Sequence, residues 1–236
     1  MGRVTDRPVI DRDAVRGSRR REGAPLLVLL HGYGSDERDL LGLAPHLPPD
    51  AAIASLPAPL DAPWPMPGRS WYPIDDLERG DPRAATAAAQ AVLDWLETDA
   101  ADAASIALLG FSQGASIALQ ALRLAPERIA AVVNLSGFVV PGDLPGDTAL
   151  RERRPPAYWG RGARDDVIRP ALIDLTAQWM PAHTALSGRV YPGLTHSVSE
   201  EELADVTAFL DRWLAEAQAP PADDSTAPDD STAPGD

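Results

Sequence analysis

The chain has 236 residues, of which 44% are hydrophobic, so it is long enough for one α/β domain with a sizeable core. Its net charge of −14 argues against nucleic acid or an anionic membrane as a primary partner. The absence of cysteine excludes disulfides, thiolate metal sites and a cysteine nucleophile.

Residues 1–24 are predicted to form an N-terminal segment that is partly irregular. Its run SRRREGAPLLVLL is similar to a twin-arginine export signal, but the apolar part covers only residues 26–30 and no cleavage site follows. No stretch reaches the ~18 apolar residues of a membrane helix. We therefore expect no stable membrane insertion and a cytoplasmic protein.

Short apolar runs alternate with longer helical patterns over residues 25–218. The predicted strands are residues 26–30, 52–55, 106–109, 131–135, 157–159 and 189–191. The predicted helices are residues 82–98, 113–125, 169–180 and 200–217. This alternation predicts an α/β fold with a mostly parallel central sheet and helices on both faces, with ligands at the carboxyl ends of the strands.

Two helix starts carry capping signals. Asp81 is a predicted N-cap, with Pro82 at the first helical position. Ser199 and Glu202 have the spacing of a capping box before the last helix.

Two segments lie outside the strand–helix pattern. Residues 55–74 are too rich in proline for regular structure, so we predict a loop with apolar side chains. Residues 219–236 contain DDSTAP twice and are predicted to be a disordered acidic tail.

The stretch LLGFSQGAS places Ser112 between two glycines, directly after a predicted strand and before a predicted helix. Gly110 and Gly114 permit the tight turn that raises a serine nucleophile above a sheet. Such a serine needs a base, a group that orients the base, and donors for the oxyanion. The plain alternative is a glycine-rich turn with an uninvolved serine.

The base is predicted to be one of the four histidines. His31 and His46 precede Ser112, against the usual order of this architecture, and His183 lies at the amino end of a strand. His31 is expected to shape its own loop by hydrogen bonds. His196 follows the last strand, at the same edge of the sheet as Ser112, and is therefore the predicted base.

The orienting acid is expected after the preceding strand, where Asp165 and Asp166 are neighbours. Spacing alone does not choose between them. The predicted oxyanion donors are the backbone N–H groups of Gln113, which follows the serine, and of Tyr33, in the loop HGYG after an earlier strand.

These motifs resemble the phospholipase/carboxylesterase family of α/β-hydrolases, which includes bacterial carboxylesterases and acyl-protein thioesterases. The matching stretches come in the family's order and cover residues 25–214; they are LLHGYGSDERDL, GRSWYPI, LLGFSQGASIALQ, NLSGF, WGRGARDDVI and YPGLTHSVSEEEL. The resemblance implies an α/β-hydrolase fold. No long insertion interrupts the predicted strands, so we expect no large lid domain.

The same resemblance implies Ser112 as nucleophile, His196 as base, and Asp165 rather than Asp166 as the acid. It also implies an acyl-accepting groove. The residues expected to line that groove are Trp64, Met66, Trp71, Tyr72 and Phe138.

The expected function is that of a serine hydrolase with residues 25–218 as its catalytic domain and with no cofactor or metal. It would cleave short- to medium-chain acyl esters, lysophospholipids or acyl-thioesters through an acyl-enzyme, as a monomer or homodimer acting on a small-molecule ester. The alternatives are acyl-protein thioesterase-like or serine peptidase activity, and a non-catalytic ligand-binding protein on the same fold.

Overall fold

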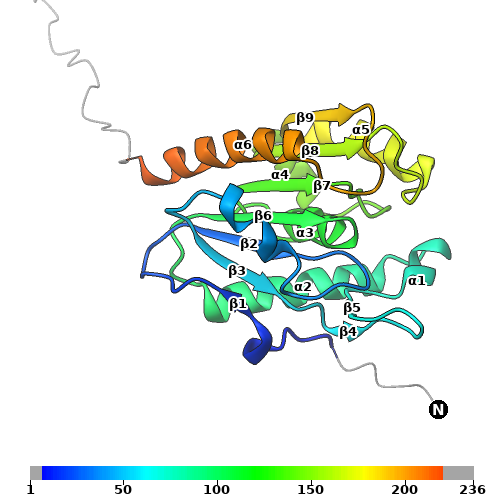
Figure 1. Ribbon diagram of the computed structural model, residues 1–236, viewed down its shortest axis with the longest axis horizontal. Helices are drawn as coiled ribbons and strands as arrows, with labels where there is room; N and C mark the ends of the chain where they lie inside the picture. The colour runs from blue at the N-terminus through cyan, green and yellow to red at the C-terminus, as the bar shows by residue number, and fades with distance from the viewer. Residues whose placement is uncertain (1–6, 220–236) are drawn as a thin grey trace, which may run out of the picture.

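A seven-stranded sheet lies between two layers of helices (Figure 1). The computed structural model describes residues 7–219. The strands are β1 (Arg16–Gly17), β2 (Leu26–Leu30), β3 (Ala52–Leu56), β4 (Leu60–Asp61), β5 (Arg69–Ser70), β6 (Ile106–Phe111), β7 (Ala131–Leu135), β8 (Pro156–Gly162) and β9 (Ala185–Tyr191). The helices are η1 (Arg12–Ala14), η2 (Leu40–His46), α1 (Ile74–Glu78), α2 (Arg83–Asp99), α3 (Gln113–Leu124), α4 (Gly146–Arg153), α5 (Pro170–His183) and α6 (Glu200–Gln218).

The strand order in the sheet is β1-β3-β2-β6-β7-β8-β9. β1 pairs antiparallel with β3, and the other six strands are parallel to one another. The predicted α/β fold with a mostly parallel sheet and helices on both faces is therefore confirmed. Because the six strands are parallel, the loops that follow them meet at one edge.

The five residues of β2 are buried on both faces of the sheet, which explains their uninterrupted apolar run. Leu26, Val28 and Leu30 belong to the core that also contains side chains of α2 and α3. Leu27 and Leu29 belong to the core on the opposite face, together with side chains of α6.

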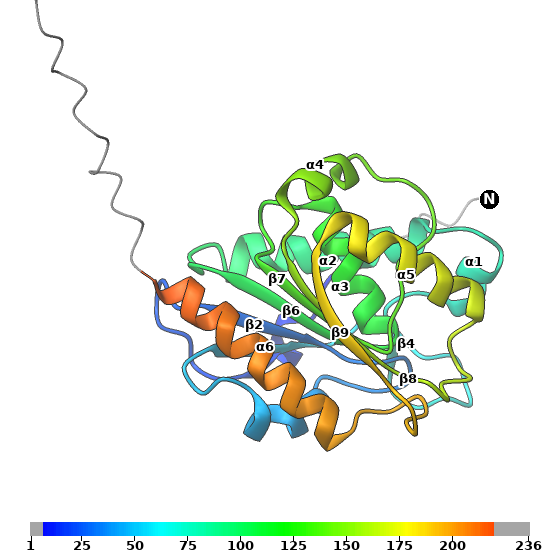
Figure 2. The same cartoon turned by 90° about the horizontal axis from the view of Figure 1, so that it is seen from above.

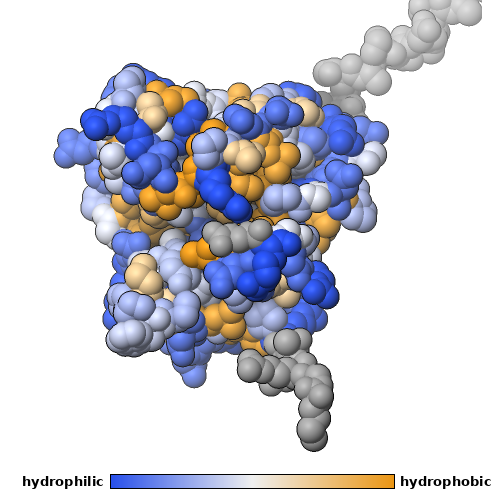
Figure 3. All heavy atoms as spheres, turned by 90° about the vertical axis from the view of Figure 1, so that its right-hand side faces the viewer, coloured by the Kyte–Doolittle hydropathy of each residue, from blue (hydrophilic) through white to orange (hydrophobic). Residues whose placement is uncertain are grey.

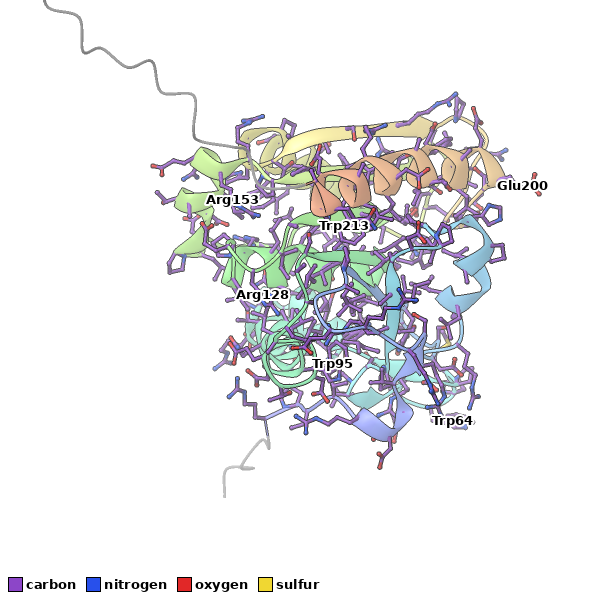
Figure 4. All side chains as sticks on the ribbon, turned by 90° about the vertical axis from the view of Figure 1, so that its left-hand side faces the viewer. Trp64, Trp95, Arg128, Arg153, Glu200 and Trp213 are labelled. Carbon is purple, nitrogen blue, oxygen red and sulfur yellow. The ribbon has the colours of Figure 1, made fainter. Side chains whose placement is uncertain are left out.

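The two helical layers are seen best from above, where α6 lies on one side of the sheet and α2, α3 and α5 lie on the other (Figure 2). The tryptophans of the two layers lie on opposite faces, with Trp95 on α2 and Trp213 on α6 (Figure 4). No helix within residues 7–219 is long and apolar enough to cross a membrane.

All six predicted strands are present, and β9 begins at Ala185, four residues earlier than predicted. β1 was not predicted, because a two-residue strand carries no apolar pattern of its own. The proline-rich stretch contains the short pair β4 and β5 and leads into α1. The predicted acidic tail lies outside the described residues, except for Ala219.

One predicted helix cap is displaced and the other is half formed: the N-cap of α2 is Pro82 and not Asp81, so Pro82 precedes the first helical residue. α2 begins at Arg83, and the Asp81 carboxylate accepts a hydrogen bond from the Arg83 backbone N–H at 3.0 Å. The Ser199 hydroxyl accepts from the Glu202 backbone N–H at 3.2 Å. The carboxylate of Glu202 makes no hydrogen bond in return, so only half of the predicted capping box is formed.

Arg123 on α3 is a buried charge that joins α3 to α4. Its guanidinium donates to both carboxylate oxygens of Asp147 at 2.8 Å and to the Val140 carbonyl at 2.7 Å. It also lies over the Trp179 ring, 5.3 Å from the ring centroid. Every polar group of this buried pair therefore has a partner nearby, as burial of two charges requires.

Replacing Arg123 by methionine should lower the free energy of unfolding by about 3–5 kcal/mol, because it leaves Asp147 buried without its partner. The matched control is Arg79→Met, because the ion pair between Arg79 and Asp76 is exposed and should contribute about 0–1 kcal/mol. Urea unfolding followed by circular dichroism measures both. Equal losses in the two variants would contradict the assignment of Arg123.

Candidate active site

Ser112 lies on a strained turn between β6 and α3. Its backbone has φ 52° and ψ −117°, a conformation that residues other than glycine rarely adopt. A Cβ atom on Gly110 would lie 2.4 Å from the Ala115 Cα, and one on Gly114 would lie 2.0 Å from the Leu30 carbonyl oxygen. Both positions therefore require glycine, as the motif predicts.

Three predicted side chains meet at the carboxyl edge of the sheet. The Ser112 Oγ lies 2.8 Å from His196 Nε2, and His196 Nδ1 lies 2.7 Å from Asp165 Oδ2. A carboxylate only accepts hydrogen bonds, so Nδ1 carries the proton and Nε2 is free to accept the proton of the hydroxyl. This is the geometry of a hydroxyl activated by an oriented base.

Asp165 is held in place by its own loop. Its Oδ1 accepts hydrogen bonds from the backbone N–H groups of Val167 at 3.0 Å and Ile168 at 3.3 Å. Its side chain is 2% exposed, whereas Asp166 is exposed and makes no contact of this kind with His196. The structure therefore brings Asp165, and not its neighbour, to the histidine.

The two predicted oxyanion donors line the same cavity as Ser112. The backbone N–H groups of Tyr33 and Gln113 have no hydrogen-bond acceptor among residues 7–219. The Tyr33 loop is held on one side, because the Gly34 backbone N–H donates to the Arg69 carbonyl at 2.9 Å. Both N–H groups are thus available to an oxygen atom bound next to Ser112.

His31 supports this loop, as we expected from the sequence. Its Nε2 accepts from the Ala58 backbone N–H at 3.1 Å, so its Nδ1 carries the proton that is donated to the Gly32 carbonyl at 2.8 Å. Burial lowers the pKa of His31 and keeps the ring neutral. The remaining histidines, His46 and His183, do not line the cavity.

The side chain of Gln113 joins the serine turn to the segment before α1. Its Oε1 accepts from the Trp71 backbone N–H at 2.9 Å, and its Nε2 donates to the Tyr72 carbonyl at 2.8 Å. The Tyr72 hydroxyl in turn bonds the Ser116 hydroxyl at 2.8 Å. No local pattern predicts these contacts, because they join residues about forty positions apart.

The cavity beside Ser112 has a volume of about 350 Å³. Three of the five predicted groove residues, Met66, Tyr72 and Phe138, line it. Its other lining residues are Gly32, Tyr33, Ile74, Leu77, Phe111, Ser112, Gln113, Val167, Ile168, Arg169, Leu172 and His196. On the face that contains the carboxyl ends of the strands, hydrophobic atoms gather in the middle with strongly hydrophilic atoms among them (Figure 3).

The other two predicted groove residues do not line the cavity. Trp64 is 93% exposed and lies at the edge of the molecule (Figure 4). Trp71 is 1% exposed, and its Nε1 donates to the His31 carbonyl at 2.8 Å. Tyr72 lines the cavity, whereas the Trp71 indole packs against the His31 ring, with the ring centroids 5.5 Å apart.

Glu202 lies buried in the first turn of α6, a few residues after His196. Its carboxylate oxygens have no hydrogen-bond partner among the described residues, and Gly160 on β8 leaves the space that one of them occupies. Burial raises the pKa of Glu202 to about 7. The folded protein therefore holds a proton on this group in a pH range where the unfolded chain does not.

This sheet order, with a serine on the turn after β6, an aspartate after β8 and a histidine after β9, defines an α/β-hydrolase fold. Within residues 7–219 no separate lid domain interrupts it. The chain belongs to the Phospholipase/Carboxylesterase family, which it matches over residues 13–214.

Relatives carry names consistent with that family. Acyl-protein thioesterase 1 of Debaryomyces hansenii is 34% identical over 111 residues, 44% of this chain and 47% of the relative. A probable carboxylesterase of Oryza sativa is 28% identical over 63% of this chain and 60% of its own length. The chain thus spans about half of the first relative and 60% of the second. Acyl-protein thioesterase 1 of Kluyveromyces lactis is 26% identical over 86% of this chain and 98% of the relative.

Solved structures show the same fold. Esterase PE8 has a TM-score of 0.66 and 28% identity, covering 86% of this chain and 99% of the other. A carboxylesterase from Mesorhizobium loti has a TM-score of 0.69 and 21% identity, covering 89% of this chain and 99% of the other.

Replacing Gly114 by alanine should destabilise the protein by about 3 kcal/mol or more, because the new methyl group overlaps the backbone of β2. Gly42→Ala is the matched control, since a Cβ there meets no atom within 4 Å and should change stability by less than about 0.5 kcal/mol. Thermal unfolding measures both. A Gly114→Ala protein as stable as Gly42→Ala would show that the turn does not need glycine.

Replacing Glu202 by glutamine should stabilise the protein more at pH 8 than at pH 5. A group with a raised pKa contributes stability below its unfolded pKa and loses it as the pH rises through about 7, whereas glutamine stays neutral throughout. The melting temperature of each protein at pH 5, 6.5 and 8 measures the effect. Glu201→Gln is the control, because Glu201 is exposed, and a pH-independent difference for Glu202→Gln would refute the prediction.

Proposed function

We propose that the protein is a serine hydrolase that cleaves carboxylic esters of short- to medium-chain acyl groups through an acyl-enzyme intermediate. One observation carries the proposal: a hydroxyl, an imidazole and a carboxylate are joined by hydrogen bonds of 2.8 and 2.7 Å beside an apolar cavity. The membership of the family and the names of its relatives support the same class of reaction.

In the proposed reaction, Ser112 attacks the ester carbonyl carbon while His196 Nε2 accepts the hydroxyl proton. Asp165 keeps the imidazole in the required tautomer and balances the charge of the imidazolium. The backbone N–H groups of Tyr33 and Gln113 stabilise the negative charge on the carbonyl oxygen. His196 then protonates the departing alcohol. In the second half of the reaction, water attacks the acyl carbon while His196 accepts its proton. The proton then returns to the Ser112 oxygen as the carboxylic acid leaves.

The size and lining of the cavity support a small acyl substrate. A volume of about 350 Å³ lies at the low end of the usual range for small-molecule sites. Apolar walls such as Phe138, Leu77 and Leu172 suit an alkyl chain. Acyl-thioesters and lysophospholipids present the same carbonyl chemistry, and we include them as candidate substrates of this site.

Replacing Ser112 by alanine should lower kcat for p-nitrophenyl butyrate on the order of 10⁶-fold, because within residues 7–219 no other hydroxyl is hydrogen-bonded to His196. Asp165→Asn should lower kcat on the order of 10⁴-fold, because an amide stabilises the wrong tautomer. Asp166→Asn is the matched control and should retain wild-type activity, since its side chain is exposed.

A fluorophosphonate probe separates the enzyme from a ligand-binding protein on the same fold. The wild-type protein should be labelled and Ser112→Ala should not. A wild-type protein that binds esters but stays unlabelled and turns over no ester would refute the proposal. Within a labelled protein, p-nitrophenyl esters from acetate to palmitate and matched acyl-thioesters then measure acyl length and leaving-group preference.

A further inference from the structure

One cation lines the cavity beside Ser112. Among the described residues that line the cavity, Arg169 is the one with a permanent charge. Arg169 follows the lining residues Val167 and Ile168 on the loop between β8 and α5. Its side chain is exposed, so a ligand in the cavity can reach it.

Arg169 has no carboxylate partner among the described residues, in contrast to Arg79 and Arg189. Arg79 pairs with Asp76, and Arg189 pairs with Glu201 at 2.7 Å. Among the side chains that the structure describes, none forms an ion pair or a hydrogen bond with the guanidinium of Arg169. Its charge is therefore uncompensated by these neighbours in a mainly apolar cavity.

The position of Arg169 in the fold does not explain its charge. It is the N-cap of α5, where the positive end of the helix dipole disfavours a cation. A bound anion would be stabilised by the guanidinium and by the helix end together.

We propose that Arg169 binds a carboxylate that the substrate carries in addition to its scissile ester, on the acyl side. This inference rests on the proposed ester hydrolysis at Ser112. A guanidinium binds a carboxylate with two parallel hydrogen bonds, and the neighbouring apolar walls strengthen such a pair by excluding water. The preferred substrates are then half-esters of dicarboxylic acids, and the acyl-enzyme carries the free carboxylate against Arg169.

Two esters with the same number of acyl carbons test this preference: p-nitrophenyl hydrogen adipate and p-nitrophenyl hexanoate. The measured quantity is the ratio of their kcat/KM values in the wild type, Arg169→Gln, Arg169→Lys and Arg164→Gln. Arg164 is the matched control, because it is an exposed arginine on the same loop that does not line the cavity. Thermal unfolding establishes that each variant is folded.

The adipate-to-hexanoate ratio should fall about tenfold in Arg169→Gln, chiefly through a higher KM for the adipate ester. Arg169→Lys should recover part of the ratio, because lysine keeps the charge and loses the planar fork. Arg164→Gln should keep the wild-type ratio.

The outcomes separate this inference from the function on which it rests. If Arg169→Gln and the wild type have the same ratio while hexanoate is hydrolysed, the inference is overturned and the ester hydrolase remains. A ratio that falls equally in Arg164→Gln overturns it as well, since the preference then comes from general surface charge. If the wild type hydrolyses neither ester, the proposed function fails, and this inference fails with it.

Discussion

The contact between the first turn of α3 and the end of β2 is the constraint on which the site depends. Gly114 lies so close to the Leu30 carbonyl that any side chain would overlap it, so two backbones meet with nothing between them. This approach leaves Ser112 a backbone conformation with positive φ, and the flanking strands, buried on both faces, hold it there. The proposed nucleophile is thus positioned by the packing of the sheet.

The parallel sheet then brings distant parts of the chain to the serine. The loops after β8 and β9 carry Asp165 and His196 to the edge where Ser112 lies. The strands alone do not orient these side chains. Backbone N–H groups of the loop hold Asp165, and the Asp165 carboxylate holds the imidazole. The sheet therefore places the loops, the loop backbone orients Asp165, and Asp165 orients His196.

Local patterns in the sequence were sufficient for the parallel strands and for residues that directly adjoin them, such as Ser112 and His196. Asp165 and Asp166 could not be separated by physical reasoning, because neighbouring carboxylates differ only in direction. The same limit applies to Trp71: its sequence neighbour Tyr72 lines the cavity, whereas Trp71 is buried and donates to the His31 carbonyl. No local sequence pattern indicated that Arg169 lines the cavity, because tertiary contacts set the path of its loop.

Gln113 combines two duties that many binding sites divide between residues. Its backbone N–H is a proposed donor to the oxyanion, and its side-chain amide holds the chain at Trp71 and Tyr72, where the cavity wall begins. A substitution that changed acyl preference by moving this wall would also move the Gln113 backbone N–H, which lies next to the reacting oxygen in the proposed reaction. Engineering of chain-length selectivity is therefore better directed at Phe138 or Leu172, which line the cavity from other elements. On the Gln113 side, selectivity and turnover are coupled through one residue.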